Sequence, residues 1–373
     1  MPVFCCSIYL ASCTTTEISK PIVHILETSE EKAIRAVMDQ LNEYEVQVHF
    51  TQIKRTNGAV TFRDYTFQEN DSVYFYPAST VKFPIALLAL EKLSGHQKLN
   101  LNTRFYVEGD TLETTFADEV IKVFAVSDNA ASNRLFEFLG QDAINEGLKS
   151  RGVGPVRIAH RLSTDDADNI TTKPLIIYLN DSTISTLNPT INAPLVPLTL
   201  TGIEKGEAFV NDDHLVKEPF NFSFKNFYPL RTQQEVLKRV IFPMAFKRQE
   251  QFQLGANERD LLLKALSSPP RTWGYNAQEY YDSYAKFFMF GDTRSPIPDE
   301  VKIFNKVGYA YGTLTDCAYV RDLSNNVEFL LTATILVNNN RVYNDDQYEY
   351  DSIGIPFLAA LGRELYEFEL KRK

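Results

Sequence analysis

Cysteine is scarce in this chain, with 4 residues among 373, and three of them (Cys5, Cys6 and Cys13) lie at the start. Cys317 stands alone in the rest of the sequence, so the body of the protein cannot form an internal disulfide. Cysteine and histidine also lack the close spacing of a zinc site, and neither a metal nor a cofactor is expected.

Long apolar runs and dense basic clusters are missing as well. The densest apolar runs, residues 83–90 and 329–337, are far shorter than the ~20 residues of a membrane-spanning helix. The 38 basic and 48 acidic residues give a formal net charge of −10 without a block of lysine and arginine. We therefore expect no segment to span a bilayer, and we do not expect nucleic acid as a partner.

What the chain does contain is enough apolar sequence for a large globular protein. Hydrophobic residues make up 44% of it, which suffices for one large core or for two lobes that share a cleft. The sequence has no internal repeat, and we expect a monomer.

The N-terminus carries a short targeting pattern. Residues 3–10 are mostly apolar, and Leu10-Ala11-Ser12-Cys13 resembles the lipobox at which bacterial lipoproteins are cleaved and lipidated on the cysteine. This resemblance implies export to the bacterial periplasm or cell envelope, with contact to the membrane through the lipid on Cys13 alone. Because no basic residue precedes the apolar stretch, an N-terminus that is apolar by chance is the alternative.

The first 140 residues contain clear signals for helices and a hairpin. Thr28 to Glu31 is typical of a capping box that opens a helix to about Leu41, and Asn57-Gly58 separates two alternating runs of a β-hairpin. Residues 83–93 are apolar nearly all round and predict a buried helix. Residues 116–126 and 130–139 predict two helices broken by a turn, and Gly140 ends the second.

The later part of the chain is less regular. Residues 158–229, rich in Thr, Asn, Pro and Phe, predict an irregular and partly β insertion. Helices are expected at residues 233–240, 258–266 and 355–370, and strands at residues 301–304, 316–321 and 328–337. Residues 1–19 would be a leader and tether, residues 20–78 and 285–373 an α/β lobe, and residues 79–284 a mainly helical lobe, with the site in the cleft between the lobes.

Three short motifs follow one another along the chain: residues 79–82 (Ser-Thr-Val-Lys), 127–129 (Ser-Asp-Asn) and 306–308 (Lys-Val-Gly). The pattern Ser-x-x-Lys also occurs at residues 29–32 and 283–286, so it carries little weight alone. Only Ser79 stands at the start of a buried apolar helix, where free N–H groups stabilise an oxyanion and burial lowers the pKa of a lysine such as Lys82.

With these residues in view, the chain resembles the class A β-lactamases and the related penicillin-binding serine hydrolases. Residues 76–93 resemble the nucleophile segment, residues 127–133 the second motif, and residues 306–308 the third, with Gly312 and residues 316–319 following it. The resemblance implies an α/β (α+β) fold of the β-lactamase/transpeptidase type, in which an antiparallel sheet is flanked by helices and joined to a mainly helical lobe.

The resemblance also implies a role for each residue of the motifs. Ser79 would attack a carbonyl carbon, and Lys82 would accept its proton. Ser127 would pass the proton to the leaving nitrogen, Asn129 would orient Lys82 and the substrate amide, and Lys306 would hold Ser127 and attract a substrate carboxylate. The N–H groups of Ser79 and of Tyr309, which follows Gly308, would form the oxyanion hole.

Two departures from the family pattern bear on turnover. Val307 replaces a hydroxyl residue that helps to bind the carboxylate of a β-lactam, so recognition of penicillins is expected to be weaker. The glutamate that activates the deacylating water has no counterpart, and Ser163 occupies the matching position. Asp165, Asp166 or His160 could replace it, and the alternative is that this stretch is only a solvated acidic loop.

These features favour a serine hydrolase that forms an acyl-Ser79 intermediate with an amide or ester, either a β-lactam or a cell-wall peptide. A D-Ala peptidase or esterase of the penicillin-binding type is the second hypothesis. The third is a surface-bound lipoprotein that keeps the fold and binds its partner with little turnover.

Overall fold

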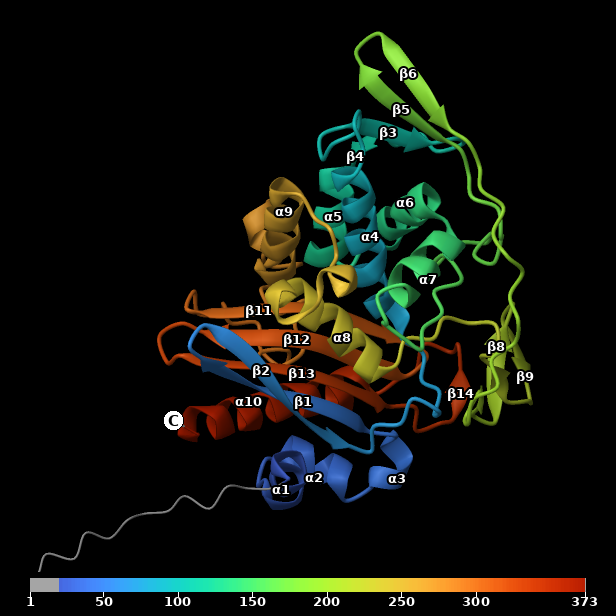
Figure 1. Cartoon of the computed structure of the whole chain (residues 1–373). Coiled ribbons are helices and arrows are strands. Elements are labelled where there is room, and N and C mark those ends of the chain that lie inside the picture. The colour runs from blue at the N-terminus through green and yellow to red at the C-terminus, as the bar shows by residue number, and fades with distance from the viewer. Residues whose placement is uncertain (1–19, 373) are drawn as a thin grey trace, which may run out of the picture.

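The computed structural model describes residues 20–372, and a five-stranded antiparallel sheet lies at its centre (Figure 1). The strand order is β11-β12-β13-β1-β2, so the two ends of the chain meet where β13 pairs with β1. The strands are β1 (Gln47–Thr56), β2 (Ala59–Phe67), β11 (Val301–Ala310), β12 (Thr313–Asp322) and β13 (Val327–Leu336). The predicted hairpin is confirmed, with Asn57 and Gly58 both at positive φ in its turn.

One face of the sheet is covered by helices from both ends of the chain (Figure 1). These are α1 (Pro21–Thr28), α2 (Lys32–Met38), α3 (Leu41–Tyr44) and α10 (Ile355–Lys371). Successive side chains of a strand point to opposite faces, so Val48 and Phe50 pack in this core, whereas Ile53 packs in the core on the other side.

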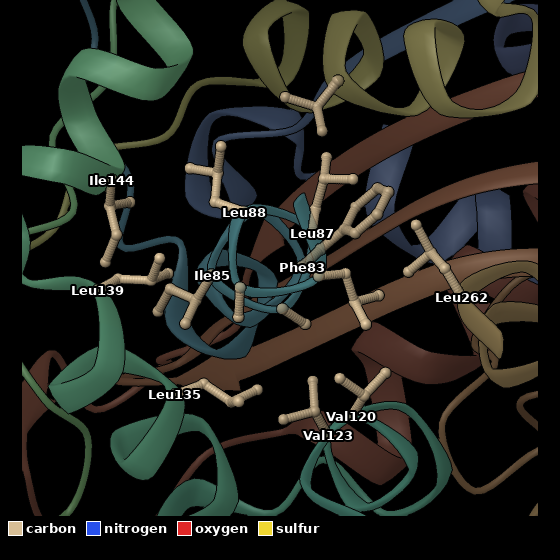
Figure 2. Packing of buried hydrophobic residues seen from close by; sticks show 14 of the residues in the cluster. Phe83, Ile85, Leu87, Leu88, Val120, Val123, Leu135, Leu139, Ile144 and Leu262 are labelled. Carbon is tan, nitrogen blue, oxygen red and sulfur yellow. The ribbon is translucent and has the colours of Figure 1, made fainter. Parts of the chain in front are cut away.

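The opposite face carries the remaining helices (Figure 1). They are α4 (Lys82–Ser94), α5 (Phe116–Ala125), α6 (Asn129–Leu139), α7 (Gln141–Lys149), α8 (Leu230–Ile241) and α9 (Ala256–Ser267). Figure 2 shows α4 at the centre of this group, ringed by side chains of its neighbours such as Val123, Leu135 and Leu262. The all-round apolar sequence of residues 83–93 is thus explained, because nearly every side of α4 meets another element.

Short strands and turns make up the rest. A four-stranded sheet of order β4-β3-β5-β6 projects beyond the helices, and two smaller sheets have the orders β10-β7 and β14-β8-β9 (Figure 1). Their bounds are β3 (Arg104–Val107), β4 (Thr114–Thr115), β5 (Leu175–Asn180), β6 (Thr183–Leu187), β7 (Glu204–Lys205), β8 (Ala208–Asn211), β9 (His214–Val216), β10 (Phe220–Asn221) and β14 (Val342–Tyr343). The turns are η1 (Ala78–Val81), η2 (Pro243–Ala245), η3 (Arg248–Glu250), η4 (Pro270–Trp273) and the π-turn η5 (Tyr350–Gly354).

The predicted capping box at residues 28–31 is wrong. Thr28 ends α1, and α2 begins only at Lys32, with Glu31 as its N-cap and no side-chain cap. The Thr28 hydroxyl instead donates to the His24 carbonyl at 2.7 Å in the last turn of α1, and the Ser29 hydroxyl donates to Glu364 of α10 at 2.8 Å. In place of a single helix over residues 28–41, the structure has the end of α1 at Thr28, the short helix α2 and the start of α3 at Leu41.

Some expectations concern residues or divisions that the structure does not test. The expected leader, with the predicted lipidation of Cys13, lies outside the described residues. The division into lobes at residues 79 and 285 stays a prediction; α8, which falls within the helical part, packs on the sheet strands β1, β12 and β13. Within residues 20–372, no helix has both the length and the apolar character that crossing a bilayer requires.

Candidate active site

The three motifs converge on the edge of the sheet formed by β11. Residues 79–82 form the turn η1 and the first residue of α4, residues 127–129 link α5 to α6, and residues 306–308 lie in β11. β11 packs directly against η1. Segments more than 200 residues apart in the sequence are therefore neighbours at this edge.

The approach of β11 to η1 depends on a glycine. A Cβ atom at Gly308 would lie 2.6 Å from the carbonyl oxygen of Pro77 and 2.8 Å from the backbone nitrogen of Ser79. Because these are backbone atoms, they cannot move aside without displacing the turn. Gly308 thus allows the backbone of the turn at Ser79 and the backbone of β11 at Tyr309 to lie close together.

Two lysines meet at one hydroxyl. Lys306 Nζ lies 2.8 Å from Ser127 Oγ, and Lys82 Nζ lies 3.3 Å from the same oxygen and also donates to the Ser127 carbonyl. The structure therefore brings together Lys82, Ser127 and Lys306. Ser79 Oγ makes no hydrogen bond within the described residues, and Asn129 donates to Ser163 Oγ at 2.9 Å, not to Lys82.

Burial sets the charge of these lysines. Loss of solvation lowers the pKa of Lys82 to about 7, against a smaller opposing effect of Asp128. Loss of solvation, together with the charge of Lys82, lowers the pKa of Lys306 well below its usual value. Two ammonium groups beside one hydroxyl repel each other in a medium of low dielectric, so the arrangement favours one neutral amine.

The backbone is strained at three positions of the site. Ala78, Ser127 and Ser163 have φ values of 46°, 57° and 52°, which are unusual for residues with a Cβ atom. Such conformations persist only where the surrounding structure holds them, and they gather at functional sites. Here they fix the backbone direction at Ala78, just before Ser79, at Ser127, whose hydroxyl contacts both lysines, and at Ser163, which accepts from Asn129.

A cavity of about 550 Å³ opens beside Ser79. Its wall combines the catalytic candidates Ser79, Asn129 and Tyr309 with a loop that includes His160 and Ser163. The other lining residues are Tyr76, Ala78, Arg161, Leu162, Thr164, Ala167, Lys225, Ala310, Tyr311, Asn344, Asp346, Tyr348 and Tyr350. Five tyrosines on this wall give a rim suited to amide or ring contacts.

The acidic candidates of the loop do not line the cavity. Asp166 pairs with Lys173 at 2.7 Å and accepts a hydrogen bond from Thr164, and these contacts lower its pKa to about 2. Asp165 is exposed. Their role as deacylating bases remains a prediction to which this geometry adds no support.

Sequence reasoning did not identify most of the cavity wall. Tyr76, Lys225, Tyr311, Tyr348 and Tyr350 come from four separate stretches of the chain. The chain contains 19 tyrosines, and no local pattern distinguishes those that face the cavity. Val307, in contrast, does not line the cavity; its side chain is buried in the apolar core on the other face of the sheet.

No group of three or more His, Cys, Asp or Glu residues within residues 20–372 is arranged to hold a metal ion.

Comparison with known proteins agrees with this architecture. The model of a family described as the β-lactamase enzyme family matches residues 30–184. A search of curated proteins finds no match.

Three solved structures resemble the whole fold. A β-lactamase from Desulfarculus baarsii has 16% identity and a TM-score of 0.52, and the match covers 93% of this chain and 96% of that one. A class A β-lactamase from Bacteroides cellulosilyticus has 14% identity, coverage of 90% and 97%, and a TM-score of 0.51. A class A β-lactamase from Mycobacterium abscessus has 14% identity and a TM-score of 0.50, and the match covers 88% of this chain and 98% of that one. The predicted fold class is confirmed.

Proposed function

We propose that this chain is a serine hydrolase that forms an acyl-enzyme on Ser79, because the β-lactamase family model matches residues 30–184 and the fold is similar to that of class A β-lactamases. One observation carries the proposal: the Ser127 hydroxyl lies within reach of both Lys82 and Lys306, beside the turn that bears Ser79. A neutral amine that can accept a proton, a hydroxyl that can relay it and a second lysine beside that hydroxyl are parts suited to acyl transfer.

Acylation uses these groups in sequence. Ser79 Oγ forms a bond to the substrate carbonyl carbon while its proton passes to the neutral Lys82. The oxyanion is held by the N–H groups of Ser79 and Tyr309, which Gly308 allows to come close. The C–N or C–O bond then breaks, and Ser127 delivers the proton from Lys82 to the leaving atom. Ser79 and Lys82 make no hydrogen bond here; in unliganded sites such contacts are often loose.

Lys306 and Asn129 position the reacting groups. Lys306 donates to Ser127 and keeps its hydroxyl proton directed toward Lys82. Asn129 lines the cavity and donates to Ser163, which supports a role in orienting the substrate amide and not Lys82. Deacylation by water completes the cycle.

The cavity and the resemblance to β-lactamases support the proposed substrate class. An amide or ester of the β-lactam or cell-wall peptide type fits a cavity of about 550 Å³ with a tyrosine-rich rim. We further propose export and a lipid anchor on Cys13, because the sequence before it is of the lipobox type. Labelling cells with a fatty acid should mark the wild type and not Cys13→Ala; equal labelling would contradict the anchor.

Hydrolysis of two substrates tests the proposed activity. A chromogenic cephalosporin and a D-Ala ester are each followed with the wild type, with Ser79→Ala and with Ser29→Ala, which alters an unrelated Ser-x-x-Lys sequence. We expect the wild type and Ser29→Ala to hydrolyse at least one substrate. Ser79→Ala should hydrolyse that substrate at least about 10³-fold more slowly. Preference for the ester would favour a D-Ala esterase or peptidase. A folded wild type that hydrolyses neither and forms no adduct would favour a binding protein.

A further inference from the structure

His160 is buried in the wall of the cavity that contains Ser79. Only 5% of its surface is exposed, and its ring lies nearly parallel to that of Tyr76, at an angle of 8°. It belongs to the loop in which Ser163 takes the place of the family glutamate. The loop is fixed to α6, because Asn129 donates to Ser163 and Asn133 donates to the Leu162 carbonyl at 2.8 Å.

The hydrogen bonds of the ring determine its tautomer. His160 Nδ1 lies 2.6 Å from the carbonyl oxygen of Arg161. A carbonyl oxygen only accepts, so the proton is on Nδ1, and Nε2 of the neutral ring carries a lone pair. Nε2 is buried and has no hydrogen-bond partner within the described residues. An acceptor left in this state costs about 1–3 kcal/mol, which is unusual unless it has a role.

The surroundings keep this ring neutral. Burial is the main cause, and the charges of Lys225 and Arg157 add to it, whereas the Arg161 carbonyl and Asp168 act in the opposite sense. Together they lower the pKa of His160 to about 4. The ring therefore carries a free lone pair throughout the pH range in which Lys82 loses its proton.

We propose that His160 is the base that activates water for hydrolysis of the acyl group on Ser79, in place of the absent glutamate. The assignment rests on the proposed function, since it requires an acyl-enzyme. Nε2 takes a proton from water as the water oxygen bonds to the acyl carbon. The bond from that carbon to Ser79 Oγ then breaks, Oγ recovers the proton, and the product leaves as a carboxylic acid.

The lifetime of the acyl-enzyme tests this assignment. After a pulse of β-lactam or D-Ala ester, intact-mass spectrometry follows the formation and decay of the adduct in the wild type, His160→Phe and His160→Gln. We expect both variants to form the adduct at a rate within about threefold of the wild-type rate. Their adducts should decay about 10²-fold more slowly or more, as for loss of a general base. Asp165→Asn and Asp166→Asn test the two rival bases in the same loop, and if His160 is the base their adducts decay at the wild-type rate.

Several results would overturn the assignment. Normal decay in either folded His160 variant, or slow decay in Asp165→Asn or Asp166→Asn alone, would remove His160 from the reaction. A wild-type adduct that never decays would do the same. Absence of any adduct on the wild type would instead refute the proposed function itself. Nitrogen NMR of the 5 histidines offers a check without variants, because a proton on Nε2 of His160 at neutral pH contradicts the proposal.

Discussion

At the scale of single residues, the charge state of Lys82 decides whether Ser79 can react. Its ammonium form cannot accept a proton, and burial lowers its pKa to about 7. The fraction of neutral amine therefore rises as pH increases through that value. The ordinary lysine pKa would leave almost no neutral amine at pH 7.

We predict that the rate of adduct formation increases about tenfold from pH 6 to pH 7.5 or above and then levels off. The rate is measured by quenching and intact-mass spectrometry at constant ionic strength. Lys82→Arg, which retains the charge and cannot lose a proton, should form the adduct at least about 10²-fold more slowly at every pH. A pH-independent rate in the wild type, or an inflection near 10, would contradict this role.

Val307 allows a second prediction at this scale. Its side chain is 2% exposed and packs in the apolar core on the far face of the sheet. We predict that Val307→Thr lowers the free energy of unfolding by about 1–2 kcal/mol, because a hydroxyl is buried among apolar groups. It should not accelerate acylation by penicillins. Urea unfolding and adduct rates test both statements, and a faster reaction would show that the hydroxyl reaches the substrate.

The motif residues were predictable from the sequence because each motif is a short, contiguous pattern. Ser79 and Lys82 are three positions apart, and residues 127–129 lie at a visible break between two amphipathic stretches. The free Nε2 of His160 was not predictable, because it depends on the Arg161 carbonyl and on packing against Tyr76. The pairing of Asn129 with Ser163 likewise depends on the fold.

At the scale of elements, the contact between β11 and η1 aligns the nucleophile with the third motif. Gly308→Ala would place a methyl group 2.6 Å from the Pro77 carbonyl oxygen and 2.8 Å from the Ser79 nitrogen. We predict a loss of at least about 10²-fold in acylation, since displacement of about 1 Å at a reacting group has an effect of this size. Gly95→Ala, at a site with no neighbour closer than 3.8 Å, should retain full activity. Equal activity of the two variants would refute the alignment.

The helix α8 is held on the sheet by a buried amide. Gln234 donates to Thr51 of β1 at 2.5 Å and accepts from Thr332 of β13 at 2.7 Å. We predict that Gln234→Met lowers the free energy of unfolding by about 1–3 kcal/mol, because two buried hydroxyls lose a partner. Chemical denaturation measures the change. An unaltered midpoint would mean that the amide does not secure α8.

The sequence predicted most of the longer helices and the five strands of the central sheet, whose periodicity is local, but neither the short strands nor how the elements pack. The pattern at residues 233–240 indicates a helix and gives no sign that it docks on β1, β12 and β13. The false capping box at residues 28–31 has a local origin, because α1 extends to Thr28 and the Thr28 hydroxyl donates back to the His24 carbonyl instead of capping α2.

At the scale of the whole molecule, a polar cluster with the buried side chains of His49 and Lys238 and the exposed Asp64 links β1, β2 and α8. His49 lies 2.7 Å from Glu69 and 3.3 Å from Asp64, and Asp64 also pairs with Lys238 at 2.8 Å. Burial opposes the charge on His49, and the two carboxylates outweigh it, so its pKa is raised above 6.5 in the folded protein. The charged ring therefore stabilises the fold below pH 6.5, and this contribution is lost as pH rises through the folded pKa.

We predict that His49→Gln destabilises the protein more at pH 5.5 than at pH 9. The difference should be about 1.5–3 kcal/mol, the size of hydrogen bonds to charged groups. Denaturation of both proteins at the two pH values measures it. A destabilisation that is the same at both would show that the charge on His49 does not contribute.

The account as a whole depends on covalent chemistry at one hydroxyl. The direct measurement is tandem mass spectrometry of peptides from the folded protein after brief exposure to a β-lactam and, separately, to a D-Ala ester. We predict an acyl adduct on Ser79 of the wild type and none on any residue of Ser79→Ala. A folded wild type that stays unmodified by both compounds, or that carries the label at another residue, would contradict the account.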